Sequence, residues 1–188
     1  MTPTPPSTPT RKEATARTRE ALIDAGLRLA ERTCLGGLSV NLIVAEAGVA
    51  KGTFFHHFGD RASYLLALHR EFHERLAAQT LSAVAGMPPG RKRLIIAART
   101  YLDGCLRDRG VRALLLEARA EPAVTAEISR RNIANAELCR ADFAALKRPY
   151  PYESAQLWVG MTAEAALLEH QAGAALPGIR AALEQFVK

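Results

Sequence analysis

The stretch that most constrains the fold is residues 39–58, where two short helical patterns meet at one glycine with no room for a loop. Ser39 can cap the first helix with its hydroxyl, and apolar residues at helical spacing follow it on one face. Gly48 supplies the left-handed backbone conformation that a larger side chain disfavours. Phe54 and Phe58, four residues apart, give the second helix an apolar side toward the first. This arrangement predicts a helix-turn-helix, whose second helix lies in the major groove of DNA.

The outward side of the second helix carries small, hydroxyl, cationic and imidazole groups, which suits a short helix that reads base edges and phosphates. A glycine at its start lets the backbone approach DNA closely. The residues expected at the DNA are Lys51 and Thr53 on base edges, Ser39, His57 and Arg61 on phosphates, and Ala50, Gly52, Phe55 and His56 around them.

This segment resembles the DNA-binding motif of the tetracycline-repressor (TetR) family of bacterial transcription regulators. The pattern of that family runs hydroxyl-V-x-x-I-A-x-x-A-G-V-S-x-x-T-hydrophobic-Y-x-H/Y-F. Residues 18–32 resemble the first helix of the family, and residues 58–66 resemble the turn into its fourth helix. The resemblance spans roughly residues 11–75, which implies a shared reading head on a divergent C-terminal domain.

Three residues depart from the family pattern. Phe55 stands where the family usually has a tyrosine whose hydroxyl holds a phosphate. Ala50 stands where a serine or threonine usually caps the recognition helix, a loss expected to cost about 1 kcal/mol. Val44 replaces the usual small alanine where the two helices cross. Together these departures imply weaker or altered DNA contacts, but the motif is retained.

The composition favours helices over strands. Hydrophobic residues make up 48% of the 188 residues and aromatic residues only 6%, and no sustained alternating run of β-branched residues occurs. We therefore expect an all-α chain of about nine helices. Its expected parts are a disordered Pro/Thr-rich tail over residues 1–10, a helix-turn-helix head over residues 11–58, and a helical ligand-binding and dimerisation body over residues 59–188.

Helical spacing and turn residues predict the remaining elements. Asp60 can cap a long helix, the segment Gly86-Met87-Pro88-Pro89-Gly90 is the clearest break, and Arg109-Gly110 is expected to form a turn. The helices are expected over about residues 11–32, 61–85, 91–108, 111–121, 122–146 and 152–173, with a short last one that includes residues 179–186.

Charge and cysteine usage narrow the class of protein. A net charge of +6 and a pI near 9.6 fit a nucleic-acid partner, although a generally basic surface gives the same numbers. Cys34, Cys105 and Cys139 are far apart and form no C-x-x-C pair, which indicates reduced thiols in the cytoplasm. No apolar run approaches the ~18 residues of a membrane span, and the N-terminus lacks the order of a signal peptide. We expect a cytoplasmic protein with no membrane partner.

The body is expected to enclose a pocket for a small-molecule effector, as helical bundles often do. Each candidate wall residue also fits an ordinary core position. The candidates combine aromatic rings, sulfur and few charges, which suggests a largely apolar molecule. They are Phe72, Tyr101, Cys105, Leu115, Arg119, Trp158 and Met161.

The helix expected over residues 152–173 is apolar on two sides and therefore needs two partners. In the TetR family the last two helices pair with those of a second subunit. The alternative is that both sides meet the core of the same chain. The residues expected at a homodimer interface are Leu157, Gly160, Leu167, Ile179, Leu183 and Phe186.

Enzymatic and metal-dependent functions find little support. His69 and His73 have the spacing of a metal-binding pair, but H-R-E-F-H is not H-E-x-x-H and no third ligand can be placed. No nucleophile signature or phosphate-binding loop occurs. We expect no cofactor, no metal and no enzymatic activity. The hypothesis is a homodimeric repressor that leaves a palindromic operator when a small molecule binds the body. The alternatives are a dimeric interaction protein with weakened DNA binding and a small helical enzyme.

Overall fold

The computed structural model describes residues 10–188, so the tail expected over residues 1–10 lies outside this range except for Thr10, which caps α1. Within it the chain forms nine α-helices and two short 3-10 helices and contains no strand, which confirms the all-α expectation. No helix in this range is both long and apolar enough to cross a membrane. The elements are α1 (Arg11–Ala30), η1 (Leu35–Gly37), α2 (Val40–Ala47), α3 (Lys51–Phe58), α4 (Arg61–Ala83), α5 (Arg91–Arg107), α6 (Arg109–Glu117), η2 (Ala118–Ala120), α7 (Pro122–Ala145), α8 (Pro151–Ala172) and α9 (Pro177–Gln185).

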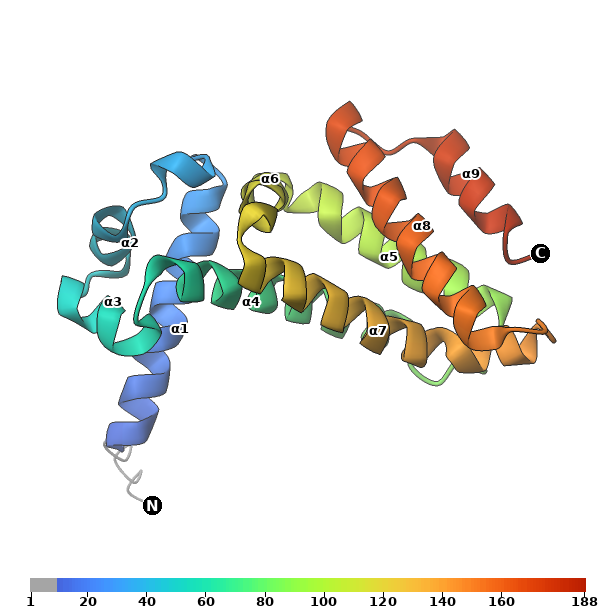
Figure 1. Ribbon diagram of the computed structural model, residues 1–188, viewed down its shortest axis with the longest axis horizontal. Helices are drawn as coiled ribbons and strands as arrows, with labels where there is room; N and C mark the ends of the chain where they lie inside the picture. Colours follow the sequence, from blue (N-terminus) through green and yellow to red (C-terminus); the bar gives the residue numbers. More distant parts are fainter. Residues whose placement is uncertain (1–9) are drawn as a thin grey trace, which may run out of the picture.

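The helices fall into two groups joined by α4 and α6 (Figure 1). Helices α1, α2 and α3 gather at one end of the molecule, and α4 leads away from them into the second group. There α7 packs along both α4 and α8, and α5 lies against α4 and α8. Helix α9 packs on α8 at the far end. We refer to residues 11–58 as the head and to residues 59–188 as the body.

The first turn of α4 packs as part of the head. Tyr64 is fully buried beside Phe54, and its hydroxyl donates a hydrogen bond of 2.8 Å to the carbonyl of Leu22. Gly26 faces this hydroxyl, and a Cβ at that position would collide with it. Because a buried polar contact and a close helix approach act together here, α4 is fixed to α1. The inward stripe expected on α1 is confirmed by its buried residues, Leu22, Ala25, Gly26 and Leu29.

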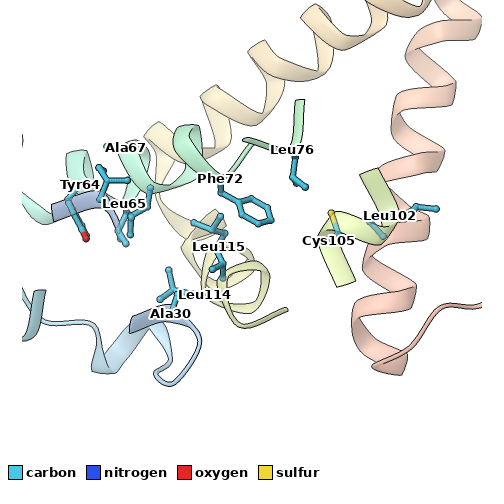
Figure 2. Packing of buried hydrophobic residues seen from close by; sticks show 14 of the residues in the cluster. Ala30, Tyr64, Leu65, Ala67, Phe72, Leu76, Leu102, Cys105, Leu114 and Leu115 are labelled. Atoms are coloured by element: carbon cyan, nitrogen blue, oxygen red, sulfur yellow. The ribbon is translucent and has the colours of Figure 1, made fainter. Parts of the chain in front are cut away.

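One continuous core connects the head with the body (Figure 2). Phe72 of α4 lies beside Leu115 of α6, and Leu76 of α4 faces α5, where it is the nearest neighbour of a Cβ placed on Gly104. This packing confirms the apolar stripe expected on α4, which consists of Leu65, Leu68, Phe72 and Leu76. A contiguous packed core transmits displacements of one helix to its neighbours.

The turn expected at Arg109-Gly110 is wrong, because α6 begins at Arg109 and only Asp108 separates it from α5. The glycine serves a different purpose. A Cβ on Gly110 would lie 2.6 Å from the Cα of Glu31 and 2.7 Å from the carbonyl oxygen of Ala30. Gly110 therefore allows α6 to approach the end of α1 closely, a long-range reason that local turn propensity does not contain.

Candidate nucleic-acid interface and internal cavity

The turn between α2 and α3 has the geometry that its sequence predicts. Ser39 caps α2, its hydroxyl accepting a hydrogen bond of 3.2 Å from the backbone N–H of Leu42. Gly48 ends α2 in the left-handed conformation, with φ of 68° and ψ of 33°. The backbone N–H of Val49 then donates to the carbonyl of Val44 at 3.0 Å. These contacts satisfy the free backbone groups at both ends of α2 and hold α3 at a fixed angle.

Helix α3 has one buried and one exposed side. Phe54 and Phe58 are buried with their ring centroids 5.4 Å apart, and both rings contact Tyr64. The opposite side carries most of the residues expected at the DNA. Of these, Ala50, Lys51, Gly52, Phe55 and His56 are exposed, and Thr53 and His57 are partly exposed.

The family departures lie where the sequence placed them. Ala50 occupies the N-cap position of α3 with extended backbone angles and offers no side-chain hydrogen bond to the helix. Phe55 is 44% exposed and makes an edge contact with Phe54, so its ring packs but presents no hydroxyl. Val44 is buried at the crossing of α2 and α3. Helix α3 thus relies on packing more than on capping for its stability.

Arg61 has a structural role besides its expected phosphate contact. Its guanidinium donates to the carbonyls of Leu35 at 2.6 Å and Leu38 at 3.3 Å. These bonds hold the segment around η1 against the start of α4. The phosphate contact of Arg61 remains a prediction.

The charge state of His57 also limits what it can offer to DNA. Burial lowers the pKa of His57, and the neighbouring charges of His56 and Arg19 lower it further. A neutral imidazole can donate one N–H to a phosphate but cannot add a counter-charge. Arg19 itself lies over the ring of Phe58, 5.4 Å from its centroid.

A cavity of about 630 Å³ lies in the body between α4, α5, α7 and α8, with Arg119 of η2 at its wall. Among the residues expected at a pocket, Tyr101, Arg119 and Trp158 line this cavity. Phe72 instead lines a second cavity of about 500 Å³ near α1 and α6. The other three expected wall residues, Cys105, Leu115 and Met161, line neither of these two cavities. As ligand contacts, all seven remain predictions.

The large cavity has an apolar part and a polar part. Of the polar part, the sequence indicated only Tyr101 and Arg119, although the charged middle of the helix now assigned as α7 was a visible signal for the rest. The apolar part consists of Leu76, Ala77, Leu81, Val84, Leu94, Ala97, Ala98, Leu138, Trp158 and Val159. The polar part consists of Arg70, His73, Tyr101, Arg119, Glu127, Arg130, Arg131, Asn132 and Asn135.

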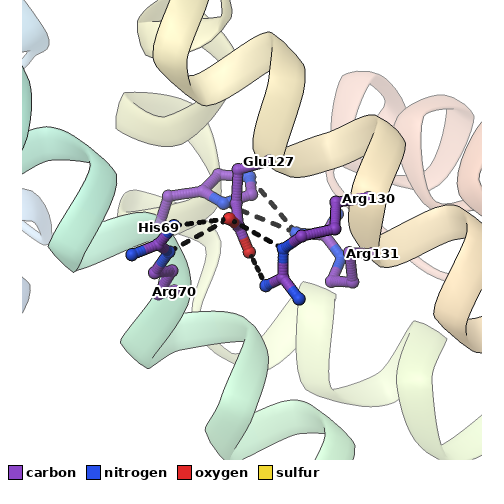
Figure 3. A network of polar contacts seen from close by, with 5 residues as sticks. All are labelled: His69, Arg70, Glu127, Arg130 and Arg131. Carbon is purple, nitrogen blue, oxygen red and sulfur yellow. Dashed lines mark hydrogen bonds and ion pairs between the residues drawn. The ribbon is translucent and has the colours of Figure 1, made fainter.

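Figure 3 shows the polar contacts at the centre of this wall. Glu127 is buried and accepts hydrogen bonds from Nε and Nη2 of Arg70 at 3.0 and 2.9 Å, and it also pairs with Arg130. Arg131 pairs with no carboxylate and instead places its Nη1 3.4 Å from Nδ1 and 3.3 Å from Nε2 of His69. The carboxylate of Glu127 is thus shared by two arginines, while the third faces an imidazole.

The two histidines of H-R-E-F-H are buried, and His73 lines the cavity. Burial lowers the pKa of His69 to about 4, and the charge of Arg131 adds to this effect. Burial also lowers the pKa of His73 well below its usual range, with further contributions from Arg131 and His69. Both imidazoles are therefore neutral near pH 7, and the positive charge at this wall belongs to the arginines.

The residues expected at a dimer interface differ in exposure. Leu157 is 68% exposed and Phe186 is 59% exposed, and Gly160 is also exposed. Leu167 and Ile179 are partly buried. Leu183 is buried within its own chain, so its burial needs no second subunit. The interface as a whole remains a prediction.

These features define an all-helical protein with an N-terminal helix-turn-helix and a cavity in its helical body. Residues 22–68 match the family of "Bacterial regulatory proteins, tetR family". The match spans the helix-turn-helix and confirms the resemblance seen in the sequence. No curated protein matches the chain.

Solved structures extend the likeness to the whole fold. A transcriptional regulator from Rhodococcus sp. RHA1 is 24% identical with a TM-score of 0.73, over 90% of this chain and 93% of that one. The multidrug binding protein EbrR, solved in complex with imidazole, is 22% identical with a TM-score of 0.73, over 100% and 98%. A TetR-like transcriptional regulator, also from Rhodococcus sp. RHA1, is 18% identical with a TM-score of 0.65, over 96% of both chains. The chain has the fold of TetR-type transcriptional regulators.

Proposed function

We propose that the protein is a cytoplasmic, homodimeric transcription repressor that binds a roughly palindromic DNA operator and leaves it when a small molecule occupies the body. The observation that carries this proposal is the exposed side of α3, held on a helix-turn-helix that matches the tetR family. It is not an enzyme in this proposal, and it needs no cofactor.

The exposed side of α3 suits base recognition. Lys51 and Thr53 present a cation and a hydroxyl at the start of the helix, where recognition helices contact base edges. A Cβ on Gly52 would meet no described atom within 4 Å, so no packing contact requires this glycine, and in the proposal it gives DNA room to approach the backbone. In a dimer, two such helices would enter successive major grooves about 34 Å apart or somewhat more.

The exposed apolar residues of α8 and α9 support dimerisation. Leu157 and Phe186 are large hydrophobic side chains that stand mostly outside the core. Exposed apolar side chains that cluster on one surface are typical of subunit interfaces. A dimer is also what a palindromic operator requires, because each half-site needs its own α3.

The cavity supports a small-molecule effector. A volume of about 630 Å³ lies in the range of drug-sized ligand sites. EbrR, which shares the fold, was solved with a small molecule bound. The effector releases DNA only if it binds more tightly to a conformation in which the spacing of the two heads does not match the operator. An effector with equal affinity for both conformations would leave their equilibrium unchanged.

A gel-shift experiment with the DNA upstream of the chain's own gene tests the repressor. We expect a specific complex whose affinity falls steeply with salt, because cationic side chains displace counterions from phosphates. Replacing Lys51 and Thr53 together by alanine should weaken specific binding by roughly 10- to 100-fold and leave the dimer intact. Lys92→Ala, at an exposed lysine near the start of α5, is the control for loss of one charge. Unchanged affinity in the double variant would show that α3 is not the recognition helix.

A second candidate function is an interaction protein that keeps the dimeric scaffold but binds DNA weakly. It is favoured by the uncapped start of α3 at Ala50 and by the missing hydroxyl at Phe55. A dimer in solution that forms no specific DNA complex and shows no salt dependence would support this candidate over the repressor.

A further inference from the structure

Three arginines lack a carboxylate partner, two in the polar part of the cavity wall and one close behind it, a region that we call the inner end of the cavity. Arg112 of α6, Arg119 of η2 and Arg131 of α7 form no ion pair within residues 10–188. The buried acids that line the cavity are already engaged: Glu127 pairs with Arg70 and Arg130, and Asp142, farther along α7, pairs with Arg93 through two contacts of 2.6 Å. The inner end therefore carries positive charge that the chain leaves uncompensated.

Arg112 is the most deeply buried of these three arginines. It is only 2% exposed, and its Nε and Nη2 find no hydrogen-bond partner among residues 10–188. Burial of a charge without a partner is strongly unfavourable, and proteins normally pair such groups or bind an ion. A buried, unpaired guanidinium next to a cavity is thus an observation that points to a negatively charged ligand.

The charges of the three arginines act on the residues that line the cavity. Burial lowers the pKa of Arg131, and the charges of Arg112 and Arg119 lower it further, while Tyr101 and Glu127 act in the opposite direction. The same charges lower the pKa of His73, after burial and the charge of Arg131. Arg112 does not line the cavity itself, but Arg119, Arg131 and His73 do. The positive potential therefore extends into the cavity.

The acidic groups near this end do not cancel it. Glu164 acts on Arg119, but less than burial and Arg112 do. Glu74 lines the cavity but is exposed to solvent. The imidazoles of His69 and His73 add no negative charge and, when neutral, one lone pair each.

We propose, building on the effector role above, that the effector is an amphipathic anion whose carboxylate or similar group binds near Arg131 and Arg119 while its apolar portion lies along α4, α5 and α8. The apolar residues of the cavity, from Leu76 to Trp158, offer the complementary surface for that portion. Arg131 supplies a guanidinium fork that suits a carboxylate, and Arg112 strengthens the field behind it. The proposal therefore adds a negatively charged group to the largely apolar effector expected from the sequence.

The test is a head-group comparison on the full chain without DNA, using octanoate, 1-octanol and octylammonium, which share one apolar chain. Binding is followed by calorimetry and by the shift of the unfolding midpoint, since a ligand of the native state stabilises it. We expect octanoate to bind at least about tenfold more tightly than 1-octanol, and octylammonium to bind more weakly still. Equal or tighter binding of the alcohol or the ammonium, or no binding of octanoate, would overturn the proposal.

Two variants and a control locate the anion. Arg131→Met and Arg112→Met should each remove the preference for octanoate over 1-octanol. Arg112→Met is also expected to fold, because it replaces an unpaired buried charge by an apolar side chain of similar length. Arg99→Met, at an exposed arginine outside the cavity, should keep the preference. A preference that survives both cavity variants would contradict the placement.

The same ligands separate this proposal from the repressor function. If octanoate binds as expected but no operator complex forms, the anion site stands and the repressor proposal fails. If an operator complex forms and 1-octanol releases the DNA as well as octanoate does, the repressor proposal is supported and the proposal of an anionic effector is contradicted.

Discussion

Ala50 shows how one side chain can limit the stability of α3, the helix that we propose to bind DNA. It takes the N-cap position of α3 with φ of −72° and ψ of 149°, the backbone conformation in which a serine hydroxyl reaches the first N–H groups of a helix. Ala50→Ser should therefore raise the free energy of unfolding by about 1 kcal/mol. Chemical denaturation measures this change. Ala45→Ser, at an exposed position inside α2, is the matched control and should give no gain.

His69 and His73 make a second residue-scale prediction, on pH. Their pKa values are lowered in the folded chain, to about 4 for His69, whereas both titrate near 6.5 when unfolded. The unfolded chain therefore binds more protons below pH 6.5, and the free energy of unfolding falls as the pH falls from about 6.5 toward 4. The slope from each histidine approaches about 1.4 kcal/mol per pH unit.

The variant His69→Gln/His73→Gln tests this origin. Its free energy of unfolding, measured by denaturation at several pH values between 7 and 4.5, should depend on pH less steeply than that of the wild type. Parallel curves for the two proteins would assign the pH dependence to other groups.

Among the elements, the head was predictable from the sequence residue by residue, whereas a pocket in the body was expected but only Tyr101, Arg119 and Trp158 of its seven candidate residues line the cavity. Ser39, Gly48, Phe54 and Asp60 act locally, through caps, a left-handed turn and helical spacing, and the structure confirms each of these local roles. The sequence predicts a turn at Gly110, but a glycine is needed there because α6 approaches α1 closely, about 80 positions earlier in the chain. Contacts between distant elements leave no periodic signal.

The arginine cluster illustrates the same limit. Arg112, Arg119 and Arg131 come from α6, η2 and α7, and only the packing of these elements brings their charges together. In the sequence they are three among 25 lysines and arginines, most of which a solvated surface explains. Burial, which the sequence does not state, distinguishes Arg112 from the rest.

A buried ion pair joins α9 to α8, and the same arginine also pairs with the exposed Asp103 of α5 at 2.6 Å. Glu169 of α8 is 0% exposed and accepts hydrogen bonds from Arg180 at 2.7 and 2.9 Å and from the N–H of Leu176 at 2.9 Å. Burial raises the pKa of Glu169, but the bonds from Arg180 and Leu176 lower it more, so the carboxylate stays charged. Arg180→Ala leaves this charge without its main partner and should cost about 3 kcal/mol of stability.

The control for this prediction is a second ion pair of α9, one that is exposed. Glu184 of α9 pairs with Arg99 of α5 at 2.6 Å, but Arg99 is largely exposed. Because exposed pairs contribute little, Arg99→Ala should cost less than about 1 kcal/mol. Chemical denaturation of both variants measures the loss in the free energy of unfolding. Equal losses would show that the buried pair is not what holds α9 to α8.

At the scale of the whole molecule, α6 is the element that links the cavity with the head. On one side it holds Gly110 against Glu31 of α1, and the carboxylate of Glu117 accepts a hydrogen bond of 3.0 Å from the N–H of Leu35. On the other side it carries Arg112, whose charge acts on the cavity wall. A ligand that attracts the arginines therefore acts on a helix that touches the head, and packed helices shift as units.

Gly110→Ala tests this link, because the new Cβ would lie 2.6 and 2.7 Å from backbone atoms of α1 and would force α6 away from it. We expect operator affinity to fall roughly tenfold, about 1.4 kcal/mol, since the head is displaced before any ligand binds. Octanoate binding in the cavity should persist. Gly36→Ala, where a Cβ meets nothing within 4 Å, is the control and should bind the operator normally. A folded Gly110→Ala protein with unchanged operator affinity and unchanged response to octanoate would show that α6 does not carry the signal, and would leave α4, fixed to the head through Tyr64, as the remaining connection.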